Sequence, residues 1–267
     1  MSALAYTLTD STTMLRRNLR RLRRYPSMTL VLVGMPIVFL LLFVYVFGGQ
    51  LGAGLGHGLT GGRDGRAGYL NYVAPGILLM TVAAAVQGTA IVVAMDMTGG
   101  IIDRFRTMPI ARACVLTGHV LASLIQALIS IAVVLGVAVA LGFRPRADAV
   151  NWLAGVGVLT LFAFALIWLA TALGLAAKSV ETASNTPMFL TLLPFLGSGF
   201  VPTSTMPEGL RQFATYQPFT PVTDTLRGLL TGAHIGGNAL GAIGWSVGIA
   251  AASYLWARHL YNRRKAH

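Results

Sequence analysis

Two long runs of uncharged, apolar residues constrain the fold of this chain more than any other feature. Tyr69–Met95 and Ala113–Leu141 contain no Asp, Glu, Lys or Arg, and each exceeds the roughly 20 residues that a helix needs to cross a bilayer. Between them lies a polar island, Gly99–Arg112, with the charged residues Asp103, Arg104, Arg106 and Arg112. Burying these four charges in hydrocarbon would cost roughly 10 kcal/mol, at about 2.5–3.5 kcal/mol each. The chain must therefore leave the membrane at the island and return.

Composition supports a polytopic membrane protein. The 267 residues are 55% hydrophobic and 10% charged, whereas soluble domains carry about 25% charged residues. The net charge of +12 does not indicate a nucleic-acid partner, because the basic residues cluster beside the apolar runs, where they anchor and orient membrane proteins next to lipid headgroups. The single cysteine, Cys114, excludes an intrachain disulfide and a multi-cysteine metal site.

The hydropathy pattern predicts a single all-α membrane domain over residues 1–267 with six transmembrane helices. The expected spans are 28–47, 69–95, 113–141, 152–177, 186–206 and 238–256. Pro36 predicts a kink in the first span, and the glycine-rich segment 48–68 predicts a flexible loop. Prolines and glycines throughout 186–206 predict a bent, protein-facing helix that is a candidate wall of a transport pathway.

Residues 1–27 predict a basic amphipathic helix on the membrane surface. Leu15, Leu19 and Leu22 form one apolar stripe, and the other faces carry Arg16, Arg17, Arg20, Arg21, Arg23 and Arg24. Such a helix lies in the headgroup layer. A cleaved signal peptide is the alternative, but the following apolar run is too long for one.

The polar island has the spacing of a short amphipathic helix. Ile101, Ile102, Phe105 and Met108 recur at helical intervals, while Asp103, Arg104 and Arg106 fall on other faces. Gly99 and Gly100 can supply a turn before this helix, and Pro109 marks its end. An ordinary solvated loop is the alternative.

Segment 207–237 is too polar to span the membrane but predicts two short helices, Glu208–Tyr216 and Pro221–Thr231. Thr220 fits an N-cap, Pro221 the first helical position and Gly232 a C-cap.

Four polar residues near the ends of the second and third spans have predicted roles. Tyr69 and Tyr72 are expected at the membrane interface. Asp96 is expected to be a solvated residue at the membrane edge, with a proton relay as the alternative. His119 is expected to contact the interface or the island, with a functional role as the alternative.

Two stretches resemble the type 2 family of ABC transporter permeases, especially the daunorubicin-resistance type of bacterial exporters. They are G-G-I-I-D-R-F-R-T-M-P-I-A-R-A, followed by Gly118 and His119, and Q-P-F-T-P-V-T-D-T-L-R-G-L-L. The hydropathy layout of nearly the whole chain is also similar. The resemblance implies that the island is a cytoplasmic coupling helix that docks on a separate ATPase subunit through Gly100, Ile101, Asp103, Arg104, Phe105, Arg106, Met108 and Pro109.

The resemblance also implies structures for two further segments of the chain. It implies an elbow helix near the N-terminus and a re-entrant helical hairpin on the outer side, with Pro218, Phe219, Pro221, Asp224 and Arg227 in the second motif. A substrate gate and a surface hairpin without substrate contact are both open for this segment.

The function implied by the resemblance is the permease subunit of an ATP-driven exporter for a lipophilic or amphipathic drug, antibiotic or lipid. Two ATPase subunits and a second permease, identical or homologous, are the expected partners. No cofactor is expected to bind directly, since ATP and Mg would bind the ATPase. Consistently, neither Lys178 nor Lys265 follows a glycine as a P-loop requires, and no catalytic motif indicates an enzyme.

Two other classes remain as alternatives. An ion- or proton-coupled secondary transporter usually keeps charged residues inside its spans, and the six predicted cores hold none. A non-transporting assembly factor is the third class. Fourteen of the 20 Lys and Arg residues fall on the side of the termini and the island, which predicts a bacterial plasma-membrane protein with both termini cytoplasmic.

Overall fold

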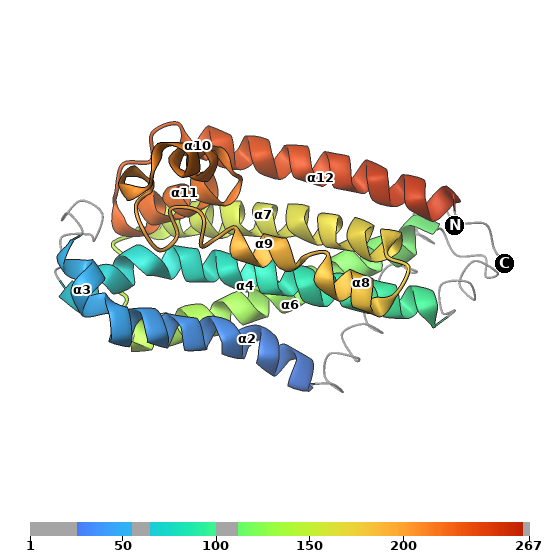
Figure 1. Cartoon of the computed structure of the whole chain (residues 1–267), viewed down its shortest axis with the longest axis horizontal. Helices are drawn as coiled ribbons and strands as arrows, with labels where there is room; N and C mark the ends of the chain where they lie inside the picture. The colour runs from blue at the N-terminus through green and yellow to red at the C-terminus, as the bar shows by residue number, and fades with distance from the viewer. Residues whose placement is uncertain (1–25, 55–64, 100–111, 264–267) are drawn as a thin grey trace.

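The structure is a computed structural model, and it describes residues 26–54, 65–99 and 112–263. These residues are helical, with no strand among them (Figure 1). Five of the helices are long and apolar enough to cross a membrane: Leu30–Ala53, Gly65–Thr98, Leu116–Ala140, Ala149–Ala176 and Asn238–Tyr261. The prediction of an all-α, multi-pass membrane protein is therefore confirmed. The predicted basic arm, apart from its last two residues, and the predicted coupling helix lie outside the described residues.

The first span is longer than its sequence predicted. It consists of α2 (Pro26–Leu41), a π-helical stretch η1 (Leu42–Phe47) and α3 (Gly48–Ala53). The glycines of α3 predicted a loop, but they allow close packing instead. A Cβ on Gly52 would lie 2.1 Å from the carbonyl oxygen of Gly65, at the start of α4. The flexible loop predicted for 48–68 is therefore wrong at both ends, because helix packing overrides local propensity there.

Helix α4 (Gly65–Thr98) forms the centre of the bundle. It contacts α2, α6 (Arg112–Ala140) and α7 (Ala149–Ala176). It also contacts the shorter helices α3, α8 (Val180–Asn185), α9 (Met188–Leu192) and α11 (Phe219–Thr231). Buried apolar side chains run along most of its length, from Leu70 through Ile77 and Val86 to Val93. Because α4 touches most of the other elements, any shift of this helix affects the whole bundle.

Helices α7 and α12 (Asn238–Arg263) lie side by side on one face of the bundle (Figure 1). Asp148 caps α7, since its Oδ1 accepts a hydrogen bond of 2.8 Å from the Asn151 N–H. Helix α12 continues past the predicted end at Trp256. The cause is visible in its packing, because Ala257 and Tyr261 are buried against α7 and α4 residues in a second apolar cluster.

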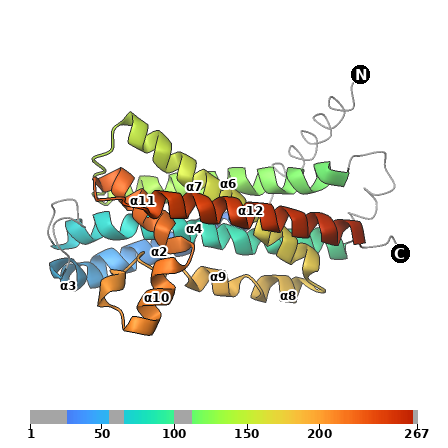
Figure 2. The same cartoon turned by 90° about the horizontal axis from the view of Figure 1, so that it is seen from above.

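The predicted fifth span, 186–206, is not one long helix. Residues 180–206 form α8 (Val180–Asn185), α9 (Met188–Leu192), a run of turns to residue 201 and the 3-10 helix η2 (Thr203–Thr205). The stretch between the predicted fourth and fifth spans, 178–185, is thus mostly the helix α8. Prolines at 187 and 194 remove backbone donors, which explains the breaks. The segment runs along α4, on the flank opposite α6 (Figure 2).

Both short helices of segment 207–237 are present. Helix α10 has the predicted bounds Glu208–Tyr216, and α11 (Phe219–Thr231) begins two residues earlier than predicted. Thr220 therefore lies inside α11 rather than at its N-cap, and Pro221 is not the first helical position. Gly232 is the predicted C-cap, with φ +79° and its N–H donating to the Gly228 carbonyl. Helix α11 packs against α4, α7 and α12.

Candidate functional site

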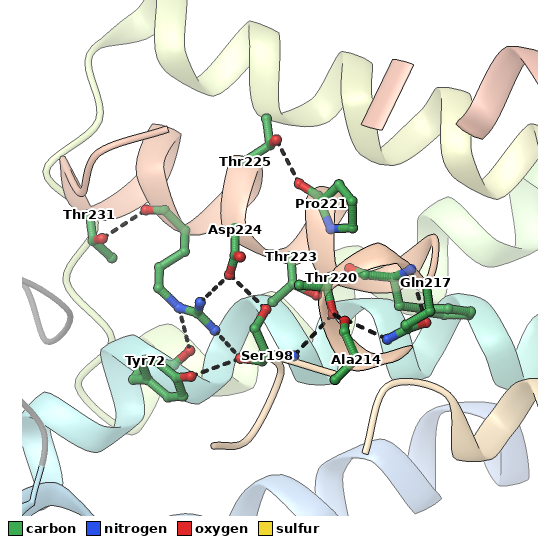
Figure 3. Close-up of polar contacts among 12 residues, drawn as sticks. Tyr72, Ser198, Ala214, Gln217, Thr220, Pro221, Thr223, Asp224, Thr225 and Thr231 are labelled. Carbon is green, nitrogen blue, oxygen red and sulfur yellow. Dashed lines mark hydrogen bonds and ion pairs between the residues drawn. The ribbon is translucent and has the colours of Figure 1, made fainter. Parts of the chain in front are cut away.

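A buried arginine joins three elements at the end of the bundle that carries α11. Arg227 is 3% exposed, and every nitrogen of its guanidinium has a partner. Nη1 donates to Asp224 Oδ1 (2.6 Å), Nη2 to the Ser198 carbonyl (2.6 Å) and Nε to the Tyr72 carbonyl (3.3 Å). We call Tyr72, Ser198, Asp224 and Arg227 the Arg227 cluster (Figure 3). It ties α11 to α4 and to the broken segment between them.

The remaining contacts of the cluster satisfy backbone groups of the broken segment. Ser198 Oγ donates to Asp224 Oδ1 (2.6 Å), and the Tyr72 hydroxyl donates to the Ser198 carbonyl (2.9 Å). The Tyr69 hydroxyl donates to the Phe200 carbonyl (3.2 Å). In a membrane protein, non-helical backbone is tolerated only where protein or a wet cavity satisfies its polar groups. The two tyrosines do this for the turns at 198–200, and both are buried in the protein, while their predicted placement at the membrane interface stays a prediction.

The joint between α10 and α11 is fixed by Gln217 and Thr220 (Figure 3). Gln217 Nε2 donates to the Leu193 carbonyl (3.1 Å), and its Oε1 accepts from the Phe219 N–H (3.2 Å). Thr220 Oγ1 donates to the Ala214 carbonyl and accepts from the Ser198 N–H (3.3 Å). These bonds hold the joint against the same run of turns that the Arg227 cluster holds.

The structure brings together two of the five predicted hairpin residues, Asp224 and Arg227, one helical turn apart on α11. Phe219 packs edge-on against Phe162, with ring centroids 5.1 Å apart, and Pro221 is buried on the same helix. Pro218 precedes α11. Helix α11 is almost entirely buried, whereas α10 exposes Leu210, Phe213 and Tyr216, and the choice between a substrate gate and a hairpin without substrate contact stays open.

Sequence reasoning missed Ser198, Gln217 and the role of Tyr72. Ser198 has no distinctive local pattern, and Gln217 opens the second family motif but was given no role of its own, because both residues act through contacts with distant parts of the chain. One signal was present: an Asp and an Arg three positions apart face one way on a helix. In T-P-V-T-D-T-L-R-G-L-L the helix carries no other charged residue. An Asp–Arg pair in such a helix indicates a buried arginine that is paired with the carboxylate.

A second buried polar pair lies at the opposite end of the bundle, between α4 and α6. His119 Nε2 lies 3.3 Å from Asp96 Oδ2, and the side chains are 5% and 2% exposed. The expectation that Asp96 is solvated is therefore wrong. The cause is that α4 continues to Thr98, so that Asp96 stays within the bundle and faces α6. The contact to the interface or the island expected for His119 stays a prediction, since residues 100–111 lie outside the described residues.

The other predicted site residues cannot be placed. The coupling residues Gly100, Ile101, Asp103, Arg104, Phe105, Arg106, Met108 and Pro109 lie outside the described residues, as do Arg16, Arg17, Arg20 and Arg21. Within the described ranges, no group of three or more His, Cys, Asp and Glu side chains could hold a metal ion.

Comparison with known proteins agrees with this architecture. The pattern of the ABC-2 type transporter family matches residues 9–231, from the N-terminal arm to the end of α11. Over 266 residues, the chain is 27% identical to the daunorubicin resistance ABC transporter permease protein DrrB1 of Streptomyces coeruleorubidus, covering 99% of this chain and 90% of that protein. It is 25% identical over 193 residues to the probable doxorubicin resistance ABC transporter permease protein DrrC of Mycobacterium tuberculosis (strain CDC 1551 / Oshkosh), covering 71% of this chain and 70% of that one.

These matches confirm the resemblance that the two sequence motifs indicated. The five apolar helices make the chain a multi-pass membrane protein, and its homologues are permease subunits of ABC transporters. Since the family pattern covers most of the chain, including the helix that holds the Arg227 cluster, this protein belongs to the ABC-2 type transporter family and fits the membrane subunit of an ABC exporter.

Proposed function

We propose that this chain is the membrane-spanning permease subunit of an ATP-driven exporter and that a separate ATPase subunit supplies the energy. The single observation that carries the proposal is the similarity to DrrB1 over 99% of this chain. The five candidate spans add physical support, because they are the scaffold that such a subunit requires. In this division of labour, ATP and Mg bind the partner rather than this chain.

The proposed assembly contains two ATPase subunits and a second permease, identical or homologous. The helix at 100–109 is the proposed contact with the ATPase, with Phe105 as an apolar anchor. Asp103, Arg104 and Arg106 would set its polar docking. Closure of the ATPase subunits on ATP would move this helix and shift the bundle between two arrangements, each favoured in one nucleotide state.

The proposed location is the bacterial plasma membrane, with both termini and residues 100–109 in the cytoplasm. The excess of Lys and Arg on that side supports this orientation. It places the α8 end of the bundle inside and the α10–α11 hairpin outside. The basic arm at 1–27 would then lie on anionic lipid of the inner leaflet.

The proposed cargo is a lipophilic or amphipathic drug, antibiotic or lipid. The names of the two relatives refer to daunorubicin and doxorubicin resistance, and the apolar composition of the spans suits such compounds. The α10–α11 hairpin is proposed to dip into the outer half of the bilayer. Support comes from the burial of α11 beside α4 and from the exposed apolar residues Leu210, Phe213 and Tyr216 on α10.

A proton-coupled transporter is the second candidate, and one observation favours it. Asp96 is buried within α4 and lies against His119, so a carboxylate and an imidazole do occur inside the bundle. Such groups serve proton-coupled transport in other proteins. The absence of charges from the predicted span cores is thus a weaker argument against this class than the sequence suggested.

Transport into proteoliposomes separates the two functions. The permease would be reconstituted with its ATPase, and accumulation of doxorubicin, which is fluorescent, would be followed with the proton gradient collapsed by an uncoupler. We expect uptake that needs ATP and survives the uncoupler. Uptake that needs the gradient and proceeds without ATP would replace the exporter assignment with the proton-coupled one.

A further inference from the structure

The Asp96–His119 pair occupies a specific place in the bundle. Asp96 lies three residues from the C-terminal end of α4, and His119 lies in the third turn of α6. The segment between the two helices is 100–111, which contains the proposed coupling helix. The pair therefore joins the two helices that enter and leave that segment, close to the point where a force on it would reach the bundle.

Apolar residues flank the pair on both helices. Val93 and Met97 on α4 pack in the same apolar cluster as Leu116 and Val120 on α6, and Ala94 packs in a neighbouring cluster. Burying a carboxylate or an imidazole in such surroundings is costly unless each has a polar partner. The contact between Asp96 and His119 thus offsets part of the cost of burying each side chain, and separating the two helix ends would forfeit that part.

Helix α4 connects this pair to the Arg227 cluster. Tyr72 and Asp96 are on the same helix, roughly 36 Å apart at a rise of about 1.5 Å per residue. Tyr72 accepts the Arg227 Nε–H through its carbonyl and donates its hydroxyl hydrogen to Ser198. A displacement of α4 at Asp96 would therefore reach Arg227. Among the described residues, this arginine bonds α11 to both α4 and the broken segment.

We infer that Asp96 and His119 are positioning residues that clamp α4 to α6, so that the two helices move as one body when the 100–111 segment is displaced. Without the clamp, α6 could shift while α4 stays, and the displacement would be lost before it reached the α11 end. The inference rests on the proposed exporter function for its consequence, but the clamp itself concerns only two helices of this chain.

Paired variants distinguish a clamp from a requirement for stability alone. Asp96→Leu removes the carboxylate beside His119, and His119→Leu removes the imidazole beside Asp96, so each single variant loses this contact and is expected to lower stability. The double variant, Asp96→Leu with His119→Leu, removes both groups, and apolar replacement of a buried pair is often neutral for stability. A purely structural role predicts that the double variant works normally. The clamp predicts that it folds but couples poorly.

Conservative variants test the chemistry of the clamp. His119→Gln places an amide N–H close to the position of Nε2, and Asp96→Asn keeps one carbonyl oxygen as an acceptor. We expect both to retain coupling, because the clamp requires a polar contact between the two side chains and not a titrating group. The control is Gln87→Leu, which removes a different interhelical bond of α4, from Nε2 to the Ser184 carbonyl on the α8 side (3.1 Å).

The first measurement is the number of doxorubicin molecules transported per ATP hydrolysed in proteoliposomes that contain the full exporter. For the double Leu variant we expect about a tenfold drop in this ratio, within the usual range of coupling energies, with ATP hydrolysis retained. His119→Gln and Gln87→Leu should stay close to the wild type. A double Leu variant that couples like the wild type would overturn the clamp, as would a loss in His119→Gln equal to that of the double variant.

The second measurement does not depend on cargo, so it separates failure of the clamp from failure of the proposed function. Spin labels would replace Met95 on α4 and Leu121 on α6, which are 42% and 40% exposed, with Cys114→Ser as background. In complexes diluted with unlabelled permease, we expect one narrow distance distribution that is the same with and without ATP. The double Leu variant should broaden or split it. An unchanged distribution in that variant would overturn the inference even if no cargo were transported.

Discussion

The guanidinium of Arg227 lies over the ring of Tyr72, with its Cζ 3.9 Å from the ring centroid. The same arginine donates from Nε to the backbone carbonyl of Tyr72. One residue of α4 is thus contacted both through its ring and through its backbone, which fixes the position of α11 along α4. A cation over an aromatic ring is worth most when both are removed from water, as they are here.

Replacement of Arg227 should destabilise the protein. Arg227→Leu removes the arginine's hydrogen bonds to the Ser198 and Tyr72 carbonyls, leaves the Ser198 carbonyl with the Tyr72 hydroxyl alone, and leaves Asp224 without its cation. Breaking a fully buried ion pair costs about 3–5 kcal/mol of unfolding free energy, and we expect the low end of this range because Asp224 is 25% exposed. Arg227→Lys keeps the charge but loses the forked donors and the stacked plane, so we expect it to recover only part of the loss. Thermal unfolding of the purified protein in detergent measures both effects.

The neighbouring helix supplies a matched control. Arg211 and Glu208 on α10 have the same spacing of three residues, but their charged atoms are 3.8 Å apart and both side chains are exposed. Arg211→Leu should therefore leave the unfolding temperature nearly unchanged. Equal effects at Arg211 and Arg227 would contradict the central place given to the buried arginine.

Close contact between two backbones makes Gly76 sensitive to substitution. A Cβ at this position on α4 would lie 2.5 Å from the carbonyl oxygen of Gly199 and 2.8 Å from its Cα, so the turns at 197–201 would have to move away. We expect Gly76→Ala to cost about 1–3 kcal/mol of unfolding free energy, as overpacking does, and to weaken the bonds of the Arg227 cluster to Ser198.

Gly136 on α6 provides the comparison for Gly76. No atom lies within 4 Å of a Cβ built there, and alanine is the better helix former by roughly 0.5–1 kcal/mol. Gly136→Ala should be neutral or slightly stabilising in the same unfolding assay. If both alanine variants unfold alike, the proximity of Gly76 to Gly199 has no energetic importance.

The long helices could be predicted from sequence because uncharged runs such as 113–141 have one stable solution in a bilayer. Contacts between distant segments could not be predicted from the sequence. The glycines of α3 predict a loop by local propensity, and only the close packing of Gly52 against Gly65 explains why they form a helix. The sequence predicts that Asp96 is solvated, because nothing in it shows that His119 lies beside this carboxylate in the bundle. The break at Pro187 was foreseen only as a bend, because the hydrogen bonds that make a fully broken segment tolerable come from Tyr72 and other distant residues.

Labelling of single cysteines tests the proposed orientation. With Cys114→Ser as background, Lys178→Cys would report the α8 end and Tyr216→Cys the α10 end, since both positions are exposed. A membrane-impermeant maleimide added to intact cells should label position 216 and not position 178, and the pattern should reverse in inverted vesicles. Labelling of position 178 from outside intact cells would contradict the cytoplasmic placement of the α8 end.

The central claim is that this chain is driven from the cytoplasm through the helix proposed at 100–109. It is tested most directly by measuring ATP hydrolysis and doxorubicin transport in the same vesicles for Phe105→Ala and Arg104→Glu. The account predicts that both variants insert and assemble, that hydrolysis continues and that transport per ATP falls about tenfold or more. Transport at the wild-type level in both variants would contradict it.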